Sequence, residues 1–109
     1  MKSIITSSLT QKRIKIMGEL IKLARLEKKI SQKELGERIG VSRPTISAIE
    51  KGQANVAIGS VFEAAYIVGL PLMVDDPEQI ESSSQAIAKM LKILPSRGRG
   101  KKAELDDNF

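Results

Sequence analysis

The 109-residue sequence contains no cysteine and no histidine. Their absence excludes disulfides, Cys/His zinc sites, thiol nucleophiles, Ser-His-Asp triads and histidine acid–base catalysis. No stretch approaches the roughly 18 uninterrupted apolar residues that a membrane-spanning helix needs, and no apolar run of signal-peptide length occurs at the start. We therefore expect a cytoplasmic protein that is not an enzyme and that holds no metal or cofactor.

Aromatic residues are also scarce, because Phe62, Tyr66 and Phe109 are the only three. A core must therefore be built from Ile, Leu, Val and Ala. Positive charge, in contrast, is concentrated at one end: residues 1–30 contain eight Lys and Arg against two acidic residues, while the formal net charge of the chain is +5. A one-sided basic field favours a polyanionic partner, most simply nucleic acid.

Two short helices joined by a glycine turn are predicted near the middle of the chain. Ser31 is a candidate N-cap, and Glu34 three residues later completes a capping box. The helix that it begins should end at Gly40, which adopts a positive φ readily. Ser42 is a second candidate N-cap, and its helix should continue to Gly52.

A further helix is predicted over residues 58–68, where Phe62 is one of the apolar residues at core spacing. The run Leu72-Met73-Val74 is β-prone and too short for a helix, so it predicts a strand. Residues 77–94 carry one apolar stripe and predict an amphipathic helix.

The two short helices have the spacing of a helix-turn-helix. Small or aliphatic residues stand where the helices must cross and turn, namely at Gly36, Gly40, Ile46 and Ile49. The run SQKELGERIGVSRPTISAIEKG, from Ser31 to Gly52, closely resembles the Xre/Cro-type family of repressors, and the similarity extends over about residues 12–70. The resemblance implies an all-α, lambda-repressor-like helix-turn-helix bundle of four to five helices that binds DNA as a symmetric dimer.

The resemblance also places DNA contacts on this chain. Gln32 matches a family glutamine that approaches a phosphate at a helix N-terminus. Arg43 is the best candidate for base readout, because a guanidinium pairs bidentately with a guanine edge; a phosphate or a neighbouring Glu is its alternative partner. Pro44 and Ala48 offer only apolar contact, so part of the readout is expected to depend on DNA shape. The predicted DNA-binding set is Gln32, Ser42, Arg43, Pro44, Thr45, Ala48, and, as phosphate contacts, Ser47 and Lys51.

Other residues of this region are interpreted as structural. The resemblance matches Arg25 and Glu50 to a partly buried ion pair, in which removal of one partner would strand a charge. Glu34 and Glu37 are the best carboxylate pair for acid–base work, but they lie on a polar helix face and are interpreted as solvated. The expected core residues include Leu35, Ile39, Ile46, Ile49, Val61 and Phe62.

The second half of the sequence predicts partners. A strand at Leu72, Met73 and Val74 would be unstable alone, so we expect it to pair with its copy in a second subunit. That arrangement is similar to the HipB-type antitoxins, a resemblance that implies a HipA-like serine/threonine kinase toxin as partner. A charged tail would contact that partner, or else DNA phosphates or solvent. The candidate contacts in the tail are Arg97, Arg99 and Phe109.

These features predict a homodimeric repressor that occupies a palindromic operator in double-stranded DNA, as the autoregulating antitoxin of a type II toxin–antitoxin pair. Two alternatives stay open: a stand-alone phage-type or metabolic repressor, and a protein-interaction module that inhibits an enzyme through its tail. The expected segments are a flexible arm at 1–9, the DNA-binding domain at 10–70, a dimerisation strand and amphipathic helix at 71–94, and a disordered basic/acidic tail at 95–109.

Overall fold

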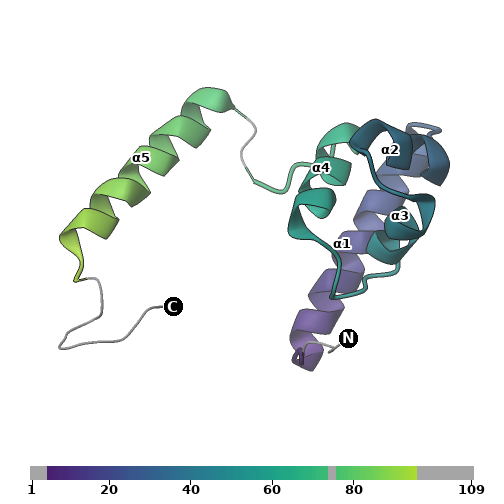
Figure 1. Cartoon of the computed structure of the whole chain (residues 1–109), viewed down its shortest axis with the longest axis horizontal. Coiled ribbons are helices and arrows are strands. Elements are labelled where there is room, and N and C mark those ends of the chain that lie inside the picture. Colours follow the sequence, from purple (N-terminus) through teal and green to yellow (C-terminus); the bar gives the residue numbers. More distant parts are fainter. Residues whose placement is uncertain (1–4, 74–75, 96–109) are drawn as a thin grey trace. The chain divides into compact units, whose positions relative to one another are not determined.

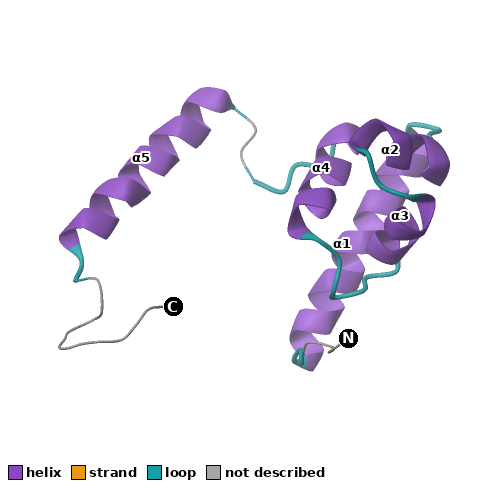
Figure 2. Ribbon diagram, in the orientation of Figure 1, coloured by secondary structure: helices purple, strands orange, loops and turns teal. Residues whose placement is uncertain are grey.

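The computed structural model describes residues 5–73 and 76–95, and these residues form five α-helices joined by loops (Figures 1 and 2). The predicted all-α fold is therefore confirmed. The helices fall into two units, one ending at Leu72 and the other beginning at Met73. The helices are α1 (Ser8–Glu27), α2 (Gln32–Ile39), α3 (Arg43–Glu50), α4 (Ile58–Val68) and α5 (Pro77–Ile93).

The ends of α2 and α3 are fixed by the predicted caps. The Ser31 hydroxyl accepts a hydrogen bond of 3.0 Å from the backbone N–H of Glu34. The Ser42 hydroxyl accepts one of 3.3 Å from the N–H of Thr45. Gly40 ends α2 with φ at 77°, in the left-handed region where a side chain would be strained. The turn between the two helices is thus dictated locally by the sequence.

The first helix begins inside the segment predicted to be a flexible arm. Ser7 caps α1 by accepting a hydrogen bond of 3.1 Å from the N–H of Thr10. Ser8 and Leu9 therefore belong to the helix and not to the predicted arm. The pattern missed this turn because a cap depends on one hydroxyl and not on an apolar repeat.

The core of the first unit lies among α1, α2, α3 and α4 (Figure 1). Ile21, Leu35 and Ile46 are fully buried at its centre. Phe62, predicted as a core residue, is 43% exposed, and that prediction is wrong. The inward face of α4 instead carries Ala64, Ala65 and Val68.

Leu72 and Met73 lie in a bend of the single chain. The strand was predicted to form by pairing with a second subunit, and it stays a prediction. Leu72 packs against the core of its own chain, whereas Met73 is 70% exposed. Val74, the third residue of the predicted strand, lies outside the described residues.

Gly18 allows α1 to approach the end of α3 closely. A Cβ at Gly18 would collide with the carbonyl oxygen of Ile49 and would lie 2.8 Å from that of Glu50. These are backbone atoms, which cannot turn aside as a side chain does. Gly18 is therefore required where α1 crosses α3.

Replacing Gly18 with alanine is expected to lower the free energy of unfolding by about 1–3 kcal/mol, because α3 must move. Gly59 is the matched control: it is also helical, and a Cβ there would meet nothing within 4 Å. Gly59→Ala should be neutral or stabilising, by up to about 1 kcal/mol. Urea unfolding measures both variants, and equal stability of the two would contradict the close approach.

Candidate nucleic-acid interface

One side of α3 is buried and the other is open. Ile46, Ile49 and Glu50 face the interior, whereas Arg43 and Pro44 are exposed. Because successive residues turn by about 100° around a helix axis, Pro44 and Ala48 lie opposite the centre of the buried face. The outermost ridge of α3 therefore carries apolar groups.

Polar side chains border this ridge. Arg43 and Ser47 lie along one edge by the same helical spacing, and Thr45 lies along the other. Thr45, Ser47 and Ala48 are each half-buried, and Lys51, directly after the helix, is exposed. The predicted DNA-binding residues of α3 thus share one surface.

A buried ion pair fixes the inner side of α3. The Arg25 guanidinium donates from Nε to Glu50 Oε2 at 2.6 Å and from Nη2 to Oε1 at 3.0 Å. Both residues are only 6% exposed. Arg25 Nη1 also donates to the carbonyl oxygen of Ile30 at 2.8 Å. Because a bidentate pair specifies direction as well as distance, it holds α3 against α1 and the start of α2.

Gln32 extends this network toward the open surface. Its side-chain amide donates to Glu50 Oε1 at 3.0 Å, and its carbonyl oxygen accepts from Arg43 Nε at 3.5 Å. Gln32 therefore connects the buried ion pair to Arg43 through one long hydrogen bond. Its phosphate contact stays a prediction. Its backbone N–H, at the first position of α2, has no acceptor within the helix and suits an anion.

Ser42 and Thr45 hold each other in place. Their hydroxyl oxygens are 2.9 Å apart and share a hydrogen bond. Ser42 is exposed, so one hydroxyl both caps α3 and stands at the surface. When Thr45 is the donor in this bond, the Ser42 hydroxyl hydrogen is still available to donate to a phosphate oxygen.

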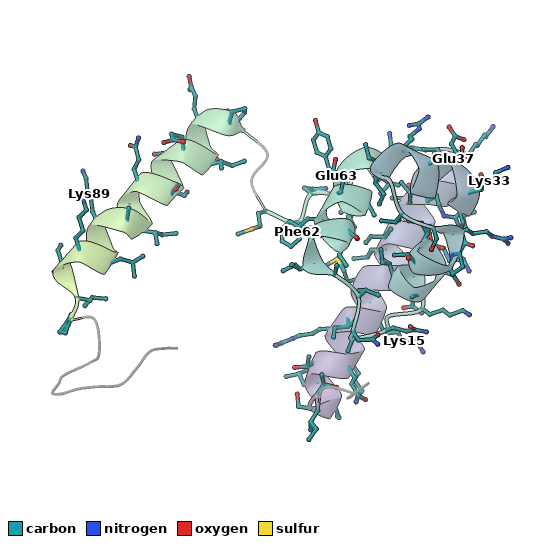
Figure 3. All side chains as sticks on the ribbon, in the orientation of Figure 1. Lys15, Lys33, Glu37, Phe62, Glu63 and Lys89 are labelled. Carbon is teal, nitrogen blue, oxygen red and sulfur yellow. The ribbon has the colours of Figure 1, made fainter. Side chains whose placement is uncertain are left out.

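Lysines from other elements flank α3. The backbone of Lys15 packs against Gly52, where an added Cβ would lie 2.6 Å from Lys15 Cα. In Figure 3, Lys15 and Lys33 point to the side of the unit on which α3 lies, and Phe62 lies on the other side. Glu37 points to the same side as Lys33 and partly offsets the positive charge there.

Lys15 and Lys33 on this surface, and the buried Gly18 beneath it, were not predicted as site residues. Lys33 follows Gln32 directly in the run that resembles the family, and this position is the signal that could have indicated it. Gly18 gives no periodic signal inside a helix, although its lack of a side chain is what lets α1 meet α3. Arg97, Arg99 and Phe109, the predicted partner contacts of the tail, lie outside the described residues.

Within the described ranges, no helix is both long and apolar enough to span a membrane, and no group of three or more acidic residues is placed to hold a metal ion. Two short crossed helices, the second of which is open on one side and flanked by cations, define a helix-turn-helix DNA-binding domain.

Comparison with known proteins finds one family match, and it lies within the first unit. Residues 21–70 match the family model described as Helix-turn-helix. These 50 residues are a little under half of the 109-residue chain, and they are similar to this helix-turn-helix family.

Five solved chains also match. One of them comes from a structure described as "Structure of HipA-HipB-O2-O3 complex", with 22% sequence identity, coverage of 71% of this chain and 99% of that chain, and a TM-score of 0.49. No curated protein matches the chain.

Proposed function

We propose that this chain is a sequence-specific transcriptional repressor that binds a palindromic operator as a homodimer. The observation that carries the proposal is the orientation of α3. Its inner side is locked by the Arg25–Glu50 pair, and Arg43, Pro44 and Lys51 are exposed on its outer side. A helix presented in this way fits the major groove of B-form DNA.

Arg43 is the base-reading residue in this proposal. Its hydrogen bond to Gln32 is long, at 3.5 Å, and exchanging it for two short bonds to guanine O6 and N7 would be favourable. Pro44 and Ala48 would contact a thymine methyl group or the groove wall. In a homodimer, two copies of α3 would reach half-sites about 34 Å apart.

Operator binding should weaken steeply with salt. If each subunit contacts four phosphates, the slope of log K against log salt should be about −7. The test is to select a bound duplex from random DNA and to measure fluorescence anisotropy across a salt series. A scrambled duplex of equal length is the control. Equal affinity for the two duplexes, or a slope near zero, would contradict the proposal.

We further propose that the repressor is the antitoxin of a toxin–antitoxin pair and binds a HipA-like serine/threonine kinase. Its support is the HipB-like resemblance of the sequence after the DNA-binding domain, where residues 71–109 follow the family match. The full chain should co-purify with a HipA-like kinase encoded beside it, and a chain ending at residue 95 should not. Equal recovery of the kinase with both chains would show that the tail does not contact it. Recovery with neither chain would show that the kinase is not a partner.

A further inference from the structure

Helix α5 carries an apolar stripe that its own unit leaves uncovered. Every described residue from 76 to 95 is exposed, and α5 contains no buried residue. Ile80, Ile87 and Leu94 recur every seven residues, and Met90 and Leu91 follow Ile87 at helical spacing. These side chains are between 49% and 68% exposed. A seven-residue apolar repeat is the pattern of a helix that packs along another helix.

The opposite face of α5 is uniformly polar. By helical spacing it carries Glu78, Glu81, Gln85, Lys89 and Lys92. Asp76 caps the helix by accepting a 3.2 Å hydrogen bond from the N–H of Glu78. A helix of 17 residues with three consecutive serines is marginal in water when alone. Its stability therefore depends on a partner for the apolar stripe.

We propose that the partner is α5 of a second copy of this chain, packed in the antiparallel direction. Acidic residues lie in the first half of the helix, at Glu78 and Glu81, and basic residues in the second half, at Lys89 and Lys92. In an antiparallel pair each acidic half lies at the same end as the basic half of the other copy, so the charges on the two outer faces do not gather like with like. Antiparallel pairing also opposes the two helix dipoles, whereas parallel pairing would align like charges and like dipoles.

The sizes of the stripe residues favour the same direction. With Ile87 at the two-fold axis, residues at equal distances on either side of Ile87 face each other across the pair. Ser83 then faces Leu91 of the other copy, and Ser84 faces its Met90. Small residues thus oppose large ones at these two levels, while Ile87 faces its own copy and Ile80 faces Leu94, so apolar contact continues along the pair. A parallel pair would set serine against serine and leave that half of the stripe loosely packed.

This inference deepens the proposed function, because it rests on the homodimer proposed there and names the surface that forms it. The expected dimer contact at Leu72 is less suitable, since that side chain packs against the core of its own chain. Oligomeric state is measured without DNA, so a failure of α5 pairing is distinguishable from a failure of operator binding.

The central test is Ile87→Glu in the full chain, followed by sedimentation equilibrium without DNA. Two glutamates would face each other at the two-fold axis, so self-association should weaken by on the order of 100-fold. Gln85→Glu adds the same charge on the polar face and should leave the dimer intact. Urea unfolding followed by far-UV circular dichroism checks that the first unit stays folded. A dimer that survives Ile87→Glu, or that Met73→Glu abolishes instead, would overturn the proposal.

The direction of pairing is tested by disulfide trapping, for which the cysteine-free chain is well suited. Chains carrying Ser84→Cys and Met90→Cys, with tags of different size, are mixed and oxidised. Antiparallel pairing predicts the mixed disulfide as the main product, with little Ser84→Cys homodimer. Predominance of the two symmetric disulfides would show parallel pairing and would overturn the antiparallel assignment.

Discussion

Replacing Glu50 with alanine is expected to lower the free energy of unfolding by about 3–5 kcal/mol, because it strands the buried charge of Arg25. Glu50 accepts two hydrogen bonds from that guanidinium and one from Gln32. Its removal therefore leaves several donors without a carboxylate in a site where both ion-pair partners are 6% exposed. Urea unfolding followed by far-UV circular dichroism measures the loss.

The matched control is the ion pair between Glu34 and Arg38, which spans 2.7 Å on the surface of α2. Its side chains are 45% and 49% exposed, so Glu34→Ala should change stability by only about 0.5 kcal/mol or less. The double variant Arg25→Met with Glu50→Met should recover most of the loss, since it removes both charges together. A similar small effect of Glu50→Ala and Glu34→Ala would show that the buried pair does not hold α3.

Replacing Arg43 with alanine should weaken operator binding by about 1–3 kcal/mol, which is roughly 5- to 150-fold in Kd. The fold should be unaffected, because Arg43 is exposed and its one hydrogen bond to Gln32 is long. Anisotropy titrations with the selected operator and with a scrambled duplex separate base readout from general attraction. The loss of affinity should be larger for the operator than for the scrambled duplex.

Two variants control for the charge of Arg43. Arg38→Ala removes the same charge from α2 and should reduce affinity for both duplexes slightly and equally. Arg43→Lys keeps the charge but not the planar fork, so it should retain the salt slope and lose preference for the operator. If Arg43→Ala binds the operator as tightly as the unaltered chain, Arg43 is not a base-reading residue.

Local chemistry made most of the fold predictable. The start of α2 is set by the hydroxyl of Ser31, and its end by the positive φ of Gly40. The hydroxyl of Ser42 sets the start of α3. The apolar pattern predicted burial less well, because burial also depends on how the helices pack together. Phe62, Ala65 and Val68 all have core spacing, yet Phe62 is 43% exposed while Ala65 and Val68 are buried beside Ala64. A periodic pattern does not state which of two adjacent apolar stripes will be covered.

The site was predictable to a similar degree. The exposure of Arg43 and Pro44 agrees with the predicted surface of α3. The pairing of Arg25 with Glu50 came from the resemblance, because residues 25 positions apart leave no local pattern. The hydrogen bonds that link Glu50 through Gln32 to Arg43 could not be predicted from the sequence, because they join residues on different helices. Gly18 was missed for the same reason, since its role is defined by a carbonyl on another helix.

The most direct measurement of the role of α3 is protection of guanine N7 from methylation on the selected operator. N7 lies in the major groove, so bound protein should protect guanines in two stretches whose centres are about 34 Å apart. Arg43→Ala should expose a guanine within each stretch while the flanking protection persists. Full methylation of every guanine N7 in the bound complex would contradict insertion of α3 into the major groove.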